Sequence, residues 1–148
     1  MIKSLLILVF SSIYLFGAGF WTLTGLEKAN IYINNEVVFL KKVTIDTIKS
    51  KMVSMLKKEG IKTKQQDSPT LMLALKSIEN DENSYVYVKL ALGEEVQTFR
   101  KDKSRTFALT YDSNDFIETD KEEIDHDILE SVDFLLSQFK EQLEDDRE

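Results

Sequence analysis

The sequence predicts an α+β protein, built as a two-layer sandwich of a mainly antiparallel sheet of about four strands with two helices packed on one face. Two segments carry apolar residues at helical spacing, and three consecutive segments between them alternate apolar and polar residues as strands do. Each helix and each strand then has one apolar side. These sides are buried when the helices lie on the sheet, and a single face of the sheet satisfies both helices.

The first 19 residues resemble an export signal. A short positive start at residues 1–3 precedes an uncharged run at 5–16, which ends at small residues 17–19. This layout is typical of a secretory signal peptide, so we expect residues 1–18 to be removed after Ala18, or else after Gly19, and the protein to lie in the periplasm. A retained anchor is the alternative, because the uncharged run extends to Gly25 and about 20 residues suffice to cross a bilayer.

The remaining chain has the size of one domain, which we place at residues 19–143, followed by an acidic tail at 144–148 that is expected to fray. The sequence contains no cysteine, so packing without disulfides must stabilise the fold. The formal net charge is −7, which argues against nucleic acid as a partner. The charge is uneven: residues 41–64 hold eight lysines and two acids, whereas residues 112–148 hold 15 acids and three bases.

The first half of the domain is predicted to contain a strand and a helix. Residues 29–33 and 36–40 are rich in strand-forming side chains, and Asn34-Asn35 between them suits a hairpin turn; a single strand followed by a loop is the alternative. From Thr44 the apolar residues recur at steps of three and four. Thr44 is the predicted cap of this helix and Gly60 its left-handed terminating residue.

Three strands are predicted next. Residues 70–78 alternate with Leu71, Leu73 and Leu75 on one side. Residues 85–100 alternate again, with a bulge or bend expected at Gly93. Residues 106–111 form the third strand with Phe107, Leu109 and Tyr111 inward, and an exposed turn at 100–105 makes the last two strands antiparallel neighbours.

The last helix has the clearest pattern in the chain. Thr119 and Glu122 have the spacing of a capping box, and acids near the start favour a helix amino terminus. Apolar residues then repeat at steps of four, four, three, four and four, namely Ile124, Ile128, Val132, Leu135, Phe139 and Leu143. A stripe of this width is typical of a helix that lies on a sheet. If both helices share one face, the lysine-rich first helix lies beside the acid-rich last one.

Five segments together resemble a recurring bacterial pattern: a helix ending in Lys58-Glu59-Gly60-Ile61, a strand at 85–90, an arginine-ended strand at 94–100, a strand at 106–111, and a closing helix with 132–139. The pattern is similar to small uncharacterised secreted or periplasmic α+β proteins, and the order of elements resembles the amino-terminal domain of the periplasmic TolB proteins. The resemblance implies a fold and a compartment. It assigns no catalytic residue.

The sequence predicts no catalytic, cofactor or metal site. His126 is the only histidine, so neither a His/Cys zinc site nor a Cys-His pair is possible, and no G-x-S-x-G accompanies it. Asp112, Asn114 and Glu123 match positions of a calcium-binding EF-hand loop, but Phe116 and Ile117 occupy its fifth and sixth positions. Adjacent acids such as Glu94-Glu95 are interpreted as turn residues.

A partner surface is the functional prediction. Tyr85, Tyr87 and Lys89 share the strand face that helices on the other side leave open, and exposed aromatics suit a protein contact. We therefore expect a periplasmic, non-enzymatic interaction module, with an unknown envelope protein as partner and an edge strand as a second docking route. The alternatives are a small carrier of an apolar ligand between helices and sheet, lined by Met52, Met55 and Met72, and a membrane-anchored protein if the first segment is retained. The lysines of the first helix are interpreted as a solvated face rather than a membrane contact.

Overall fold

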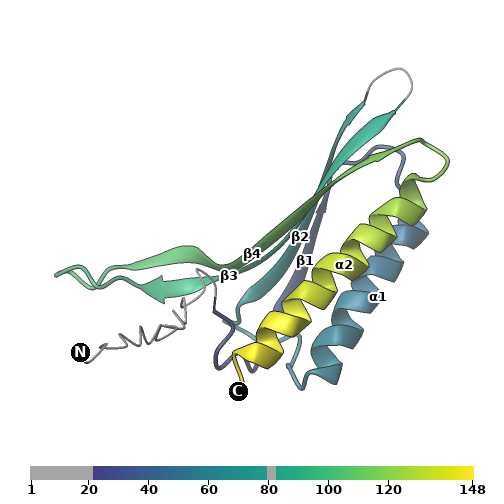
Figure 1. Cartoon of the computed structure of the whole chain (residues 1–148). Helices are drawn as coiled ribbons and strands as arrows, with labels where there is room; N and C mark the ends of the chain where they lie inside the picture. Colours follow the sequence, from purple (N-terminus) through teal and green to yellow (C-terminus); the bar gives the residue numbers. More distant parts are fainter. Residues whose placement is uncertain (1–21, 80–82) are drawn as a thin grey trace, which may run out of the picture.

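The computed structural model describes residues 22–79 and 83–148, so the expected signal peptide at 1–18 lies outside the described residues. Within them the order is β1 (Asn30–Asn35), α1 (Lys42–Lys58), β2 (Thr70–Glu79), β3 (Ser84–Gln97), β4 (Arg105–Thr119) and α2 (Ile124–Asp145). The strands form one sheet in the order β1-β2-β3-β4, with β1 parallel to β2 and the other pairs antiparallel. Both helices lie on one face of this sheet, which confirms the predicted α+β sandwich (Figure 1).

The core lies between the helices and the sheet. All six residues of the predicted stripe on α2 have no exposed surface. They meet Leu71, Leu73 and Leu75 of β2, together with the alternate residues of β3. The described residues 22–79 and 83–148 include no helix that is both long and apolar enough to span a membrane.

The segment after β1 is a loop and not the second arm of a hairpin. Asn35 holds a tight turn, because its side chain accepts the backbone N–H of Val37 at 3.0 Å and donates to the Val37 carbonyl at 3.2 Å. Val37 is buried, and the chain then enters α1. A parallel pair needs a crossover connection, and α1 supplies it between β1 and β2.

The predicted cap of α1 is wrong. The helix begins at Lys42, and Thr44 lies buried in its first turn, where its hydroxyl donates to Asp125 of α2. The Asp125 carboxylate also accepts the backbone N–H of Lys41 at 3.1 Å and pairs with the Lys41 ammonium at 2.9 Å. A side chain from the other helix therefore caps α1. Desolvation acts against the charge, but the hydrogen bonds from Thr44 and Lys41 lower the pKa of Asp125 below its ordinary value. At the other end Gly60 has φ of +74°, as predicted.

The strand predicted at 106–111 continues to Thr119, so residues 112–119, which include the Asp112 and Asn114 of the EF-hand comparison, form the second half of β4. Its helix-facing polar residues find partners on α2: Ser113 donates to Gln138 at 2.6 Å, and Ser131 donates to Asp115 at 2.8 Å. Thr119 consequently ends a strand instead of capping α2. Asp120 instead holds the turn that leads into α2, accepting the backbone N–H groups of residues 122 and 123 at 2.8 and 2.9 Å, and α2 itself begins without a side-chain cap from Glu123.

A bulge exchanges the two faces of the sheet on which the side chains of part of β4 lie. The register shifts between Leu92 and Gly93, because Leu92 pairs with Tyr111 whereas Gly93 pairs with Leu109. Tyr111 is buried as predicted, but Phe107 is 62% exposed on the opposite face of the sheet. The prediction that Phe107 and Leu109 point inward is wrong, since one extra residue in a strand exchanges its two faces.

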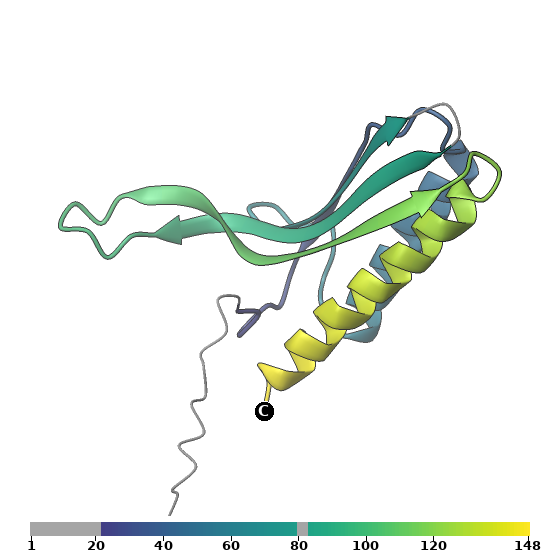
Figure 2. The same ribbon diagram turned by 45° about the horizontal axis from the view of Figure 1, so that its top comes forward.

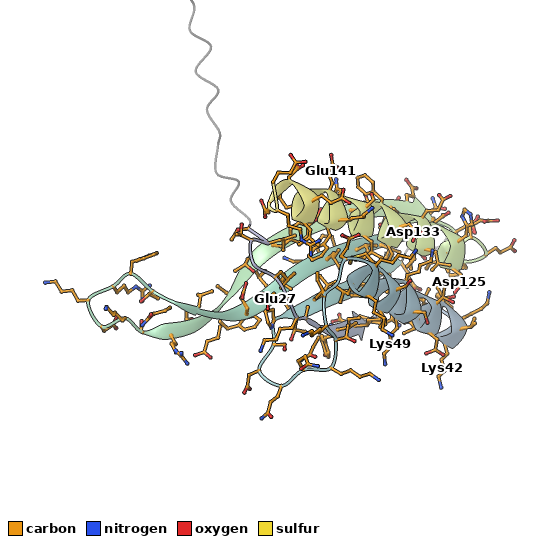
Figure 3. All side chains as sticks on the ribbon, turned by 90° about the horizontal axis from the view of Figure 1, so that it is seen from below. Glu27, Lys42, Lys49, Asp125, Asp133 and Glu141 are labelled. Atoms are coloured by element: carbon orange, nitrogen blue, oxygen red, sulfur yellow. The ribbon has the colours of Figure 1, made fainter. Side chains whose placement is uncertain are left out.

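The two helices lie side by side with their opposite charges in contact, as predicted (Figures 1 and 3). Lys51 of α1 pairs with Asp133 of α2 at 2.9 Å. The acidic tail also has partners that no local pattern shows: α2 continues to Asp145, and the next carboxylate, Asp146, accepts the backbone N–H of Leu23 at 2.6 Å. Arg147 then donates to the Glu59 carbonyl at 2.8 Å.

Candidate protein-binding face

Neither helix covers the opposite face of the four-stranded sheet, and we call it the open face (Figure 2). Strand alternation and the pairing register place on it one residue in two from each strand. These are Tyr32 and Asn34 of β1, Met72, Ala74, Lys76 and Ile78 of β2, Tyr85, Tyr87, Lys89 and Ala91 of β3, and Asp112, Asn114, Phe116 and Glu118 of β4.

The three residues predicted as a partner surface all lie on the open face. Tyr85 is 46% exposed, and its hydroxyl donates to Glu118 at 3.2 Å. The Tyr87 ring lies 4.7 Å from the Phe116 ring, centroid to centroid. Lys89 donates to Asp112 at 2.8 Å. Side chains of the neighbouring strand β4 thus hold each of the three side chains in place.

Lys89 is a positioned cation and not a reactive amine. The hydrogen bond to Asp112 raises its pKa above the ordinary value of lysine, and this outweighs the opposing effect of desolvation. A nucleophilic lysine needs a lowered pKa. The two opposite charges also neutralise each other at the centre of the open face. Both side chains are largely covered there.

Sequence reasoning missed most of the apolar surface of the open face. Ile78 is 76% exposed and Phe116 74% exposed, and both lie beside the predicted tyrosines. The alternation of Phe116 and Glu118 with Ile117 and Thr119 was a usable signal, but the surrounding acids concealed it. Phe107 joins the same face only because of the bulge.

Gly93 makes room for this apolar surface. A Cβ atom at Gly93 would lie 2.2 Å from Cζ of Phe107 and 2.8 Å from Cε of Met72. Those two side chains therefore pack directly over the glycine backbone. A shallow groove of about 730 Å³ adjoins them, lined by residues 67–70, 93–97, 105 and 107.

The layer between helices and sheet is filled by core side chains. Met52 is fully buried, and Met55 packs against the core. Met72 lies on the open face instead, so the methionine set proposed for a carrier is divided between the two sides of the sheet.

Catalytic and metal candidates are dispersed or exposed. Asp112 and Asn114 belong to β4, where an EF-hand loop is not formed. Glu94 and Glu95 lie in β3, not in a turn, and point to opposite faces: Glu94 accepts the Thr110 hydroxyl at 2.5 Å, and Glu95 pairs with Arg105 at 3.5 Å.

His126 lies on the surface of α2 beside Asp127 and Glu130, and the three offer ligand atoms within 4.8 Å of one another. The hydrogen bond to Asp127 and the charge of Glu130 raise the pKa of His126. The carboxylates thus favour a proton on the ring, and a metal ion would have to displace it.

Comparison with known proteins gives no assignment. No family model matches this chain, and no curated protein matches it either.

Proposed function

We propose that this protein is an exported, non-enzymatic interaction module that binds a partner protein of the cell envelope through the open face. The observation that carries the proposal is the exposure of aromatic and branched apolar side chains on the one side of the sheet that the helices leave uncovered. Tyr32, Ile78, Tyr85, Phe107 and Phe116 are each between 46% and 76% exposed there. Aromatic residues are enriched at protein interfaces, and contiguous apolar patches of this kind mark interaction sites.

The charges of the open face define the chemistry of the partner. Lys89 is already neutralised by Asp112, and Lys76 lies 3.6 Å from Glu36. A partner with a strongly charged surface would gain little from these internal pairs. We therefore expect the partner to present a mainly uncharged, apolar surface, with tyrosine hydroxyls at the rim of the contact.

Export is supported by the amino-terminal pattern and by the resemblance to secreted and periplasmic proteins. Intact-mass measurement of the protein from fractionated cells tests it. A periplasmic species lacking about 18 residues supports removal of a signal peptide. A full-length species in the membrane fraction supports the alternative of a retained anchor.

Site-specific crosslinking tests the docking face. A photo-crosslinking amino acid at Ile78 is expected to capture the partner, because this side chain is 76% exposed on the open face. The same group at Phe134, which is 50% exposed on α2, is the matched control and should capture nothing. Equal capture at both positions, or capture only at Phe134, would refute the open face as the docking site.

Substitution gives the second test. Tyr85→Ser with Tyr87→Ser should abolish capture from Ile78 while leaving the far-ultraviolet spectrum unchanged, since neither ring contributes to the core between the layers. Phe134→Ser removes an exposed ring of similar size from α2 and should leave capture intact. Retained capture by the double tyrosine variant contradicts the proposal.

A further inference from the structure

The hairpin formed by the ends of β3 and β4 projects away from the rest of the protein. Pairing between β2 and β3 ends at Thr70 and Gly93, whereas β3 and β4 remain paired as far as Gln97 and Arg105. Residues 94–108 therefore form a two-stranded arm, which extends beyond both helices in the two views (Figures 1 and 2). A two-stranded arm with this much free surface adds little to a core, so its chemistry calls for a separate explanation.

The tip of the arm combines a fully exposed ring with unpaired cations. Phe99 has a relative exposure of 108%. Arg100, Lys101 and Lys103 form no ion pair with any residue in the described ranges 22–79 and 83–148, and Arg105 has a partner, Glu95, at 3.5 Å. With Asp102 counted against the three unpaired cations, residues 99–104 carry a net charge of +2, in a chain whose formal charge is −7.

The tip is an ordered turn. The Thr98 N–H donates to the Ser104 carbonyl at 2.9 Å, and the Lys103 N–H donates to the Arg100 carbonyl at the same distance. Asp102 accepts the Ser104 N–H at 3.2 Å, and Lys103 adopts a left-handed φ of 47°. Because these bonds use the backbone and the short polar side chains, Phe99 and the cationic groups remain directed outward.

The length of the arm separates this positive end from the acidic body. Six residue steps from Gly93 to Phe99 span about 20 Å in an extended strand. The Debye length at physiological ionic strength is about 8 Å. The acids of α2, such as Asp133 and Glu141 in Figure 3, therefore have little electrostatic effect at the tip. An anionic surface would repel the body and attract the end of the arm.

We propose that the arm tip binds an anionic lipid surface, with Phe99 inserted among the lipids at the interface and Arg100, Lys101 and Lys103 at the headgroup phosphates. The site differs in place and chemistry from the open face. A turn of this size cannot supply the area of about 1,000 Å² that a specific protein interface requires. A bilayer needs no matching pocket, and an apolar ring flanked by cations is the combination that interfacial binding uses.

Vesicle co-sedimentation tests the proposal on the protein isolated from cells with its natural amino terminus, so that all variants share the same first residues. Binding to vesicles with phosphatidylglycerol should exceed binding to pure phosphatidylcholine, and it should weaken as salt is added. Each cation near an anionic surface contributes about fivefold to binding. The triple variant R100S/K101S/K103S should therefore bind about 100-fold more weakly. Phe99→Ser should lose about tenfold.

A matched variant separates the tip from general charge. K42S/K49S/K57S removes three exposed lysines from α1, two of which are visible in Figure 3, and should retain the binding of the unmodified protein to within about twofold. If this α1 variant loses as much binding as the tip variant, or if the tip variant loses none, the proposal is wrong. Circular dichroism on each variant confirms that the fold is retained.

Insertion of the ring has its own readout. In a Trp21→Phe background, Phe99→Trp should show a blue-shifted emission with anionic vesicles and quenching by brominated lipid chains. An unshifted, unquenched emission would overturn insertion. The lipid proposal also fails if the unmodified protein does not bind vesicles while the triple tip variant loses crosslinking to an acidic protein. In that case the tip is a protein-binding site.

Discussion

Replacement of Asp125 by alanine is expected to destabilise the protein by about 2 to 3 kcal/mol, because this carboxylate caps the other helix. It accepts the Lys41 backbone N–H at 3.1 Å and the Thr44 hydroxyl. Hydrogen bonds to charged groups contribute about 1.5–3 kcal/mol, and loss of a cap costs about 1 kcal/mol. The ion pair with the Lys41 ammonium adds little, because that side chain is 70% exposed.

Asparagine at the same position separates charge from hydrogen bonding. Asp125→Asn keeps an acceptor oxygen for Lys41 and Thr44, so at neutral pH it should cost only about 1 kcal/mol. The pKa of Asp125 is lower in the folded protein than in the unfolded chain. Its charge therefore stabilises the fold above the unfolded value of about 3.9, and this contribution is lost as the pH falls through the folded value. The difference in unfolding free energy between the native protein and Asp125→Asn should be constant from about pH 5 to 7 and should disappear below about pH 4.

Urea denaturation followed by far-ultraviolet circular dichroism measures these differences in the free energy of unfolding. The slope of that free energy against urea concentration should be the same in every variant. Asp133→Ala is the control: it removes an exposed ion pair between the same two helices, whose side chains are 37% and 54% exposed, and should cost less than about 1 kcal/mol. A cost for Asp125→Ala no larger than that of Asp133→Ala would refute capping between the helices. A stability difference between the native protein and Asp125→Asn that persists at acid pH would refute the role of charge.

Three further substitutions test the packing by the same denaturation assay. Phe139→Ala should cost about 3–5 kcal/mol, because the ring is fully buried and forms a T-shaped pair with the Tyr111 ring, with centroids 5.0 Å apart; a cost below about 1 kcal/mol would contradict this core. Gly93→Ala should cost about 1–3 kcal/mol, because its Cβ would meet the Phe107 ring, and an unchanged midpoint would show that the ring moves freely. Gly60→Ala should cost about 1 kcal/mol from backbone strain alone, since nothing lies within 4 Å of its Cβ, and a stabilised variant would contradict the left-handed φ.

The sequence predicted those elements whose apolar pattern is locally complete. The stripe of α2 from Ile124 to Leu143 repeats at helical spacing, and every predicted member is buried. The predicted burial of Leu71, Leu73 and Leu75 on one face of β2 is confirmed for the same reason. Burial of one side is encoded residue by residue, so periodicity alone reveals it.

The errors occur where a distant partner decides the structure. The second half of β4 has a polar helix-facing side, and it is a strand because Ser113 and Asp115 find Gln138 and Ser131 on α2. Thr44 had the right chemistry for a cap, but Asp125, 81 positions away, occupies that role. No local window contains these pairs.

The candidate site was predicted in part. Tyr85, Tyr87 and Lys89 were placed on the open face by alternation within a single strand. Phe107 was placed on the wrong side, because a one-residue bulge changes the parity of everything beyond it. The bulge or bend predicted at Gly93 is confirmed, but the residue it displaces on β4 depends on pairing, which the sequence of one strand does not contain.

Under the proposed function, folding and recognition use opposite sides of this sheet. The helix side buries the α2 stripe, and substitutions there should change stability. Ile78, Phe116 and Phe99 contribute little to the core, since 74% or more of each is exposed. Exposed apolar rings promote aggregation, so their presence on one face and at one tip requires a benefit outside the folding of this chain. Variants on the two sides should accordingly separate: Phe139→Ala lowers stability strongly, whereas Tyr85→Ser with Tyr87→Ser removes partner capture and costs only the cross-strand contacts with Glu118 and Phe116.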